Sequence, residues 1–258
     1  METRLPYPFR HLIISWISQK VFDRLTYTVQ NGLNKGLRRR GGLGWLPRER
    51  DTAEVLFWKA LSLQGKVVYD IGAFHGLLTM YFAQHATQVV AWEPNSKNRQ
   101  RLEENLRLNS FTNVIVRPYG LSSERALANM TFDSLVPGTA SLDPKIASGS
   151  QHEAVQLRTL DQEEGLKAPD LIKVDVEGLE LEVLKGASRA LSCHPDLFLE
   201  MHGSDSDDKR RRAQEIVDHL WTLGYKNIVH VETRCTITPQ NAAEAVEGHL
   251  YARANRIE

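Results

Sequence analysis

From residue 66 onward, short apolar runs alternate with longer amphipathic segments. Such runs are typical of strands in a parallel sheet covered on both faces, and the intervening segments repeat apolar residues at helical spacing. Strands are expected at 67–71, 88–93, 114–119, 171–175, 197–201, 227–231 and 249–253. Helices are expected at 52–63, 76–85, 97–109, 179–191 and 209–223. The alternation predicts an α/β fold, doubly wound around a seven-stranded, mostly parallel, Rossmann-like sheet.

The connection between the third and fourth expected strands is longer than an ordinary crossover. It contains the polar stretch 136–152, which we expect to border the substrate, and flanking segments at 126–132 and 154–160 that alternate like extra strands. Asp161, followed three residues later by Glu164, predicts the start of a helix.

Residues 1–60 form a basic lead-in with the run Arg38, Arg39 and Arg40, followed by several glycines. We interpret it as partly helical. It serves either as a lid or anion-binding arm over a site, or as a solvated helix with a glycine linker, and the second interpretation is favoured. The predicted division is therefore a lead-in at 1–60 and a catalytic domain at 61–258.

The charge balance and the cysteine content indicate which binding partners and which cellular compartment to expect. Lys and Arg number 32, as do Asp and Glu, so the chain has no net field to attract nucleic acid or an anionic membrane. The two cysteines lack a zinc or redox spacing, which indicates a reducing compartment. The apolar stretch 12–17 is too short for a bilayer span or a signal peptide. We expect a cytoplasmic protein that binds neither nucleic acid nor membrane, whose oligomeric state the sequence does not indicate.

Ligands of open α/β sheets bind beyond the carboxyl ends of the strands. Asp70 is the penultimate residue of the first expected strand, and Gly72, Ala73 and Gly76 follow in a loop that leads into a helix. Asp70 occupies the position where a dinucleotide fingerprint has its first glycine, and its carboxylate would repel a pyrophosphate. A carboxylate suits S-adenosylmethionine, which carries a sulfonium and an ammonium group and no phosphate. The loop therefore predicts a site for this cofactor, and a nicotinamide cofactor is the alternative.

The second expected strand ends in Glu93, and Asn95 follows it. A carboxylate at this position can accept hydrogen bonds from both hydroxyls of a ribose, as the equivalent acid does in nucleotide-binding α/β units. Glu93 and Asn95 are therefore predicted cofactor contacts.

The fourth and fifth expected strands end in a third polar cluster: Asp175 and Glu177, then Glu200 and His202. Methylation of a hydroxyl needs a general base, for which Asp175 and His202 are the first candidates. Asp175, Glu200 and His202 could instead hold a divalent cation, and sequence does not decide between these roles. Glu177 and Glu200 are further catalytic candidates. Alternatively, Glu177 compensates a helix dipole, Glu200 pairs with Lys173 or an arginine, and His202 is a structural hydrogen-bonding residue.

The stretch from 67 to 202 resembles the FkbM family of S-adenosylmethionine-dependent methyltransferases. The motifs that carry the resemblance are DIGAFHG, AWEPN, TASLDP, RTLD, IKVDVEG and FLEMH, in this order. The resemblance implies a class I methyltransferase fold, cofactor contacts at Asp70, Gly72, Gly76 and Glu93, and methylation of a hydroxyl on a sugar, glycan or polyketide-type molecule. Phe74 stands where the family usually has asparagine. The alternatives are an N-methyltransferase and a non-catalytic module that binds an adenosyl cofactor.

Overall fold

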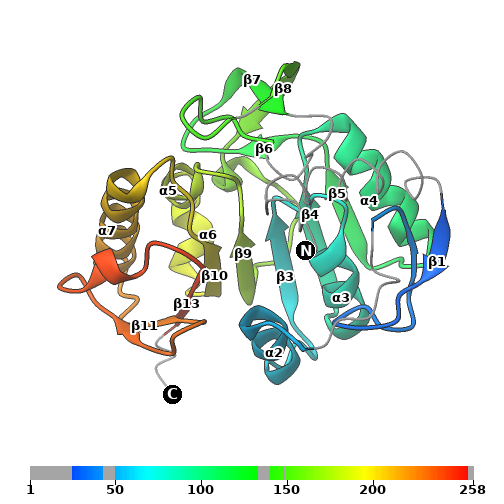
Figure 1. Ribbon diagram of the computed structural model, residues 1–258, viewed down its shortest axis with the longest axis horizontal. Coiled ribbons are helices and arrows are strands. Elements are labelled where there is room, and N and C mark those ends of the chain that lie inside the picture. Colours follow the sequence, from blue (N-terminus) through cyan, green and yellow to red (C-terminus); the bar gives the residue numbers. More distant parts are fainter. Residues whose placement is uncertain (1–24, 43–49, 133–139, 148, 255–258) are drawn as a thin grey trace, which may run out of the picture.

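The computed structural model describes residues 25–42, 50–132, 140–147 and 149–254. An eight-stranded sheet in the order β12-β11-β13-β10-β9-β3-β4-β5 forms its centre (Figure 1). The strands are β3 (Val67–Ile71), β4 (Gln88–Trp92), β5 (Val114–Arg117), β9 (Leu171–Val174), β10 (Asp196–Glu200), β11 (Asn227–His230), β12 (Thr236–Ile237) and β13 (His249–Arg253). The seven predicted strands are thus confirmed in one sheet, and the short β12 is an addition.

Neighbouring strands from β5 to β10 are parallel, and β13 runs antiparallel between β10 and β11. The chain winds from β3 outward to β5, then crosses back to β9 and winds outward in the other direction. The winding direction therefore reverses between β3 and β9, and the carboxyl ends of these two strands lie where ligands bind in such folds.

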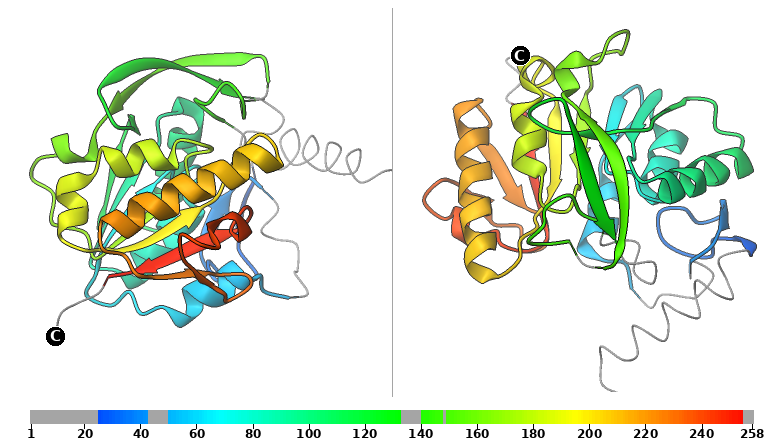
Figure 2. Two further views of the ribbon diagram at one scale, coloured as in Figure 1. Left: turned by 90° about the vertical axis from the view of Figure 1, so that its left-hand side faces the viewer. Right: turned by 90° about the horizontal axis from the view of Figure 1, so that it is seen from above.

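Helices cover both faces of the sheet (Figure 2). They are α2 (Ala53–Ala60), α3 (Leu77–His85), α4 (Ser96–Leu108), α5 (Glu180–Lys185), α6 (Ser188–Ser192) and α7 (Ser206–Thr222). The single helix predicted at 179–191 is wrong, because the chain breaks between α5 and α6. At this break a Cβ on Gly186 would lie 2.0 Å from the carbonyl oxygen of Ser122, so the glycine permits a close approach of two backbones.

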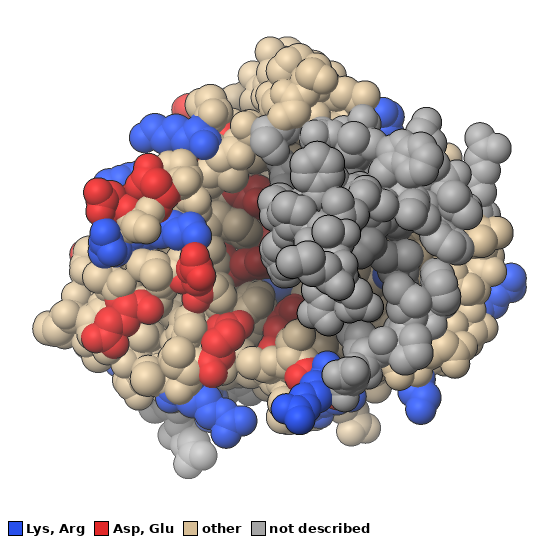
Figure 3. Space-filling view, viewed as in Figure 1, with Lys and Arg blue, Asp and Glu red and all other residues tan. Residues whose placement is uncertain are grey.

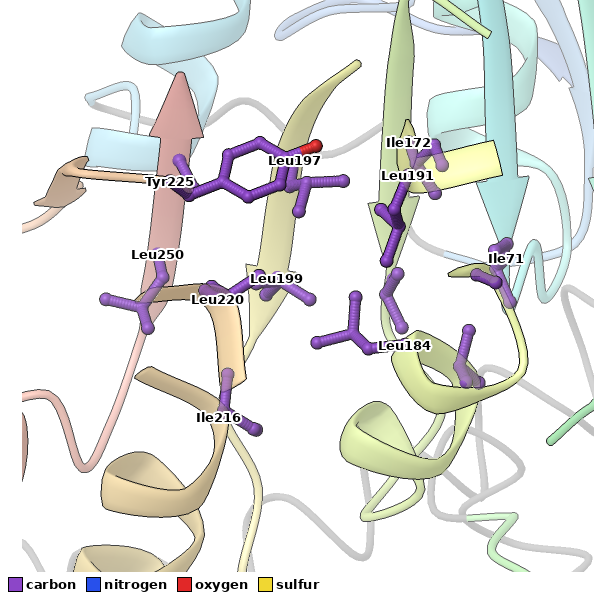
Figure 4. Close-up of a cluster of buried hydrophobic side chains, with 14 of the residues drawn as sticks. Ile71, Ile172, Leu184, Leu191, Leu197, Leu199, Ile216, Leu220, Tyr225 and Leu250 are labelled. Atoms are coloured by element: carbon purple, nitrogen blue, oxygen red, sulfur yellow. The ribbon is translucent and has the colours of Figure 1, made fainter. Parts of the chain in front are cut away.

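Alternating side chains of the strands pack into separate hydrophobic clusters on the two faces of the sheet. Ile71, Leu197 and Leu199 pack toward α5, α6 and α7, and Figure 4 shows part of this cluster. On the opposite face, Trp58 of α2 and Phe198 of β10 pack together, with their ring centroids 4.3 Å apart. Burial on both faces explains why the central strands are mainly apolar, with Asp70 and Lys173 as buried exceptions.

The long connection between β5 and β9 forms a small second sheet in the order β6-β8-β7. It contains β6 (Gly120–Leu121), β7 (Ala126–Phe132) and β8 (Gln151–Arg158), so the two predicted extra strands are confirmed. The middle of the predicted polar stretch is described at 140–147 and 149–152, and its remaining residues lie outside the described chain.

The helix start predicted at Asp161 is wrong. A short 3₁₀ helix, η3 (Leu160–Gln162), begins one residue earlier and is capped reciprocally by Thr159 and Gln162. The carboxylate of Asp161 instead accepts the amide of Arg189 at 2.9 Å, at the first turn of α6. The residue therefore caps a different helix, one that sequence spacing does not relate to it.

Besides α2, which confirms a partly helical lead-in, the described part of residues 1–60 is a β-hairpin of β1 (Thr26–Thr28) and β2 (Arg38–Arg40). The hairpin is held on α4 by two side chains: Asn105 accepts the backbone amide of Arg40 at 2.9 Å, and Asn109 accepts the backbone amide of Arg38 at 2.8 Å.

The stretch 12–17 lies outside the described residues, and the division of the chain at residue 60 stays a prediction. No helix among the described residues is long and apolar enough to cross a membrane.

Candidate functional site

Two cavities open at the carboxyl ends of the central strands. Cavity A, of about 150 Å³, lies against β3, β4 and β9, and its wall includes Glu93 and Glu177. Cavity B, of about 310 Å³, lies between β3, β9, α2 and the N-terminal hairpin. Gly72, Phe74 and Asp175 line both cavities, so the two meet at the switch point of the sheet. On this face of the molecule, acidic side chains gather along the central hollow (Figure 3).

The turn after β3 requires glycine. Gly72 has a φ of +82°, and a Cβ there would lie 1.7 Å from the carbonyl oxygen of Asp175. The amides of Gly72 and Ala73 both donate to the carbonyl oxygen of Trp92, at 3.0 Å each. The turn therefore binds the ends of β4 and β9 closely together. Gly76, with a φ of +81°, precedes α3 and packs against Leu102.

Phe74 adopts a φ of +50°, in the left-handed region where asparagine is the commonest residue besides glycine. This conformation gives a physical reason for the asparagine that the FkbM motif usually has here. In this chain the Phe74 ring stacks on His75, with centroids 3.8 Å apart, and stands between the two cavities. The substitution thus replaces an amide by an aromatic surface at the junction.

Glu93 is buried at the end of β4, and each of its oxygens accepts one backbone amide. Phe74 donates to Oε2 at 2.8 Å and Asn95 donates to Oε1 at 2.9 Å. Burial raises the pKa of Glu93 to about 7 in spite of these two donors. A carboxylate oxygen has a second lone pair, so Glu93 can still accept hydrogen bonds from a ligand in cavity A.

Asn95 and Gly76 are not among the residues that line the two cavities. Asn95 caps α4, since its side-chain oxygen accepts the amides of Lys97 and Asn98. Gly76 is the N-cap residue of α3. Their roles as cofactor contacts stay predictions.

Lys173, on β9, joins the ends of β3 and β9, a role that sequence reasoning missed. Its ammonium donates to the carbonyl oxygen of Gly72 at 2.7 Å and pairs with Asp70 at 3.3 Å and Asp175 at 3.2 Å. Burial opposes its charge, but the two carboxylates outweigh burial and raise the pKa of Lys173 above its ordinary value. A lysine inside the apolar run 171–174 was the available signal, because a buried charge needs a partner.

Asp70 is fully buried, and its second oxygen accepts the hydroxyl of Thr79 at 2.6 Å. Lys173 and Thr79 thus already compensate the carboxylate that we expected to face the cofactor cation. Asp70 lines cavity B, and its direct contact with a cofactor stays a prediction.

The four predicted catalytic residues come together around His202. Its Nε2 lies 3.9 Å from Asp175, 3.6 Å from Glu177 and 3.7 Å from Glu200. Its Nδ1 contacts Glu180 at 2.9 Å, a buried partner that sequence reasoning missed. Burial lowers the pKa of the imidazole, but the surrounding carboxylates outweigh burial and raise it to about 9.

Among the described residues, Lys173 forms ion pairs with Asp70 and Asp175, and the suggested ion pair between Lys173 and Glu200 is not formed. Glu200 contacts two imidazoles instead, those of His202 and His249, each at 3.7 Å. Burial acts to raise the pKa of Glu200, but these imidazoles lower it to about 2. The ionised carboxylate is therefore part of a chain of alternating charges at the end of β10.

Glu177 lies before the N-cap residue of α5 and adopts a φ of +52°. The hydroxyl of Ser141, from the connection between β7 and β8, donates to its carbonyl oxygen at 2.6 Å. Burial raises the pKa of the Glu177 carboxyl to about 7. Strained backbone of this kind gathers at functional sites, and here it directs a carboxyl group toward cavity A.

Asp175, Glu200 and His202 also meet the geometric condition for a cation site, because one ligand atom from each lies within 4.8 Å of the others. Two carboxylates and an imidazole suit magnesium, manganese or zinc to different degrees. That a divalent cation binds to Asp175, Glu200 and His202, in place of a proton on the His202 imidazole, stays a hypothesis.

Comparison with known proteins decides the family. The Methyltransferase FkbM domain matches residues 70–226, which is more than half of the chain. The chain belongs to the FkbM methyltransferase family. The predicted resemblance is therefore confirmed, and the matched FkbM region includes Asp70, Glu93, Lys173 and His202. The N-terminal hairpin and α2 lie outside this region.

Individual relatives cover the chain to different extents. The hexuronic acid methyltransferase AglP of Haloferax volcanii is 31% identical over an alignment of 179 residues that covers 65% of this chain and 68% of AglP. The AMB antimetabolite synthetase AmbE of Pseudomonas aeruginosa is 28% identical over 238 residues, and the chain spans 11% of that protein. A solved FkbM methyltransferase from Methylobacillus flagellatus matches with a TM-score of 0.55 at 21% identity, covering 79% of this chain and 48% of that one. This match confirms the predicted α/β fold.

Replacing Lys173 by methionine should lower the free energy of unfolding by about 3–5 kcal/mol, because the buried Asp70 loses its cation. Lys185→Met is the control, since it removes an exposed pair with Glu182 and should cost less than about 1 kcal/mol. Urea denaturation of both variants measures the difference. Equal losses would contradict the central role of Lys173.

Gly72→Ala should destabilise the FkbM domain more than Gly65→Ala does. Both glycines have a positive φ, of +82° and +78°, so both substitutions carry a conformational cost of about 1–2 kcal/mol. Only at Gly72 does the new Cβ also collide with the backbone of Asp175, which should add about 1–3 kcal/mol. The comparison by urea denaturation isolates the collision, and indistinguishable variants would show that the turn can relax.

Proposed function

We propose that this FkbM domain transfers a methyl group from S-adenosylmethionine to a hydroxyl group of a sugar, glycan or polyketide-type acceptor. The observation that carries the proposal is the junction of the two cavities at Gly72, Phe74 and Asp175, directly beside the acidic cluster around His202. One cavity is available for the cofactor, the other for the acceptor, and the polar groups lie where the two ligands would meet.

Cavity A fits the adenosine part of the cofactor. Glu93 is positioned to accept the ribose hydroxyls, and apolar residues such as Leu121, Met130 and Leu142 offer a surface for an adenine ring. The absence of a Cβ at Gly72 keeps the backbone close to the ligand. S-adenosylmethionine supplies an activated methyl group on a sulfonium, so the protein needs chiefly to position the acceptor and exclude water.

The acceptor hydroxyl must lose its proton as it attacks the methyl group. Asp175 and Glu177 line the cavity at the junction and are the proposed proton acceptors. His202, which contacts both carboxylates through Nε2, is proposed to hold them in place. Its own orientation is fixed by the contact of Nδ1 with the buried Glu180.

Support for an oxygen acceptor comes from this proton-accepting cluster and from the sugar-acid substrate in the name of the relative AglP. Methylation of a neutral amine needs no strong base, so an N-methyltransferase would leave the cluster without an evident task. A non-catalytic cofactor-binding module would likewise make no use of it.

The proposed function is tested by incubating the protein and methyl-labelled S-adenosylmethionine with a small-molecule cell extract. We expect a labelled methyl ether. The carbon chemical shift of the transferred methyl group distinguishes an ether from a methylamine, and alkali releases a methyl ester as methanol. A parallel reaction after exhaustive EDTA treatment tests the cation hypothesis: full activity would eliminate it, and loss restored by one divalent metal would support it. Absence of any transfer would contradict the proposed function.

Glu93→Ala should weaken binding of S-adenosylhomocysteine by about 1–3 kcal/mol, because the ribose loses a charged hydrogen-bond acceptor. Titration calorimetry measures the affinity. Glu153→Ala is the matched control: this partly exposed carboxylate also accepts a backbone amide, that of Ser96 at the start of α4, but lies outside cavity A. Unchanged affinity in Glu93→Ala would remove the proposed ribose role.

A further inference from the structure

About half of the described residues that line cavity B lie outside the matched FkbM region. The hairpin contributes Val29, Asn34 and Arg39 to its wall, and α2 contributes Glu54 and Val55. The family core supplies the opposite wall, at the ends of β3, β9 and β10. Because the part of the wall outside the matched FkbM region faces the part inside it, cavity B is suited to select an acceptor.

The hairpin is fixed in place over this cavity. Two backbone amides of the hairpin donate to side chains of α4. In addition, the side-chain amide of Asn34 donates to the carbonyl oxygen of Leu77, at the start of α3, at 2.7 Å. The amide oxygen of Asn34 has no hydrogen-bond partner among the described residues, although the residue is only 6% exposed. An unsatisfied buried acceptor in a cavity wall indicates a ligand that carries a hydrogen-bond donor.

The charges around cavity B favour the same kind of ligand. Four carboxylates and two cations are among the described residues of its wall, so acceptors of hydrogen bonds predominate and the wall has a net negative charge. The residues are Glu54, Asp70, Asp175 and Glu200, with Arg39 and Lys173. Hydroxyl groups can donate to Glu54, Asp175 and Glu200, since Asp70 is already compensated by Lys173 and Thr79. An anionic ligand would meet the like charge of these three carboxylates. Leu33, Val55 and Leu78 add apolar surface beside the polar groups.

We infer that the side of cavity B formed by the hairpin and α2 is the acceptor site, beyond the predicted cofactor contacts Asp70 and Ala73, and that it takes an uncharged sugar ring in preference to a sugar acid. A neutral sugar presents hydroxyl donors at its edge and apolar C–H groups on its faces, which matches the two kinds of surface in the wall. Its hydroxyl reaches the methyl group at Gly72, Phe74 and Asp175, where cavity B joins cavity A. The inference rests on the proposed function and specifies its substrate class.

The first test uses the full chain saturated with S-adenosylhomocysteine. Saturation-transfer NMR compares neutral methyl hexosides with the matching methyl hexosiduronates. We expect at least one neutral glycoside to bind about tenfold more tightly than its uronate, or better. Equal or stronger binding of the uronates, or no binding of any neutral glycoside, would overturn the inference. Failure of the wild-type protein to bind S-adenosylhomocysteine would instead contradict the proposed function.

The second test fills cavity B from α2. In Val55→Trp the indole should occupy the cavity, lower glycoside affinity at least about tenfold, and leave affinity for S-adenosylhomocysteine within about twofold. Leu56→Trp is the matched control, because Leu56 is the next residue and is exposed, and both affinities should stay unchanged. If Val55→Trp does not fold by circular dichroism, Asn31→Trp on the hairpin loop replaces it. Unchanged glycoside binding, or a parallel loss of S-adenosylhomocysteine binding, would overturn the inference.

Discussion

A single buried ammonium group organises the functional end of this sheet. Lys173 reaches from β9 to the turn after β3 and pairs with Asp70, near the end of β3, and Asp175, directly after β9. The winding of the sheet reverses between these two strands, so the ion pairs tie together the place where a ligand must bind. Breaking one of these ion pairs would leave a buried charge without a partner. Because this is costly, the paired arrangement of the network is strongly favoured.

The site around this network is divided between two kinds of structure. The strand ends and the glycine turn belong to the FkbM region, whose residues hold the buried carboxylates in fixed positions. The hairpin and α2 lie outside that region and complete the second cavity. This division fits a general property of α/β enzymes, in which a rigid sheet supplies the chemistry and peripheral elements choose the substrate.

The sequence-based predictions were wrong where segments far apart in the chain contact each other. The seven central strands were predictable, since burial on both faces makes each of them mainly apolar. The break between α5 and α6 was missed because it depends on the approach of Ser122 to Gly186. Asp161 was assigned to its local helix, although it caps α6 through Arg189. The hairpin was missed because its order depends on Asn105 and Asn109 of α4.

The sequence by itself determined the α/β class, the family, and which polar residues stand at the strand ends, since these follow from local periodicity and short motifs. Only the tertiary structure decided which charges pair. Lys173 compensates Asp70, and His202 is surrounded by Glu180, Glu177 and Asp175. These pairings determine which groups are ionised, and so what the site can do. They join residues far apart in the chain, and their strength depends on burial, which no local pattern specifies.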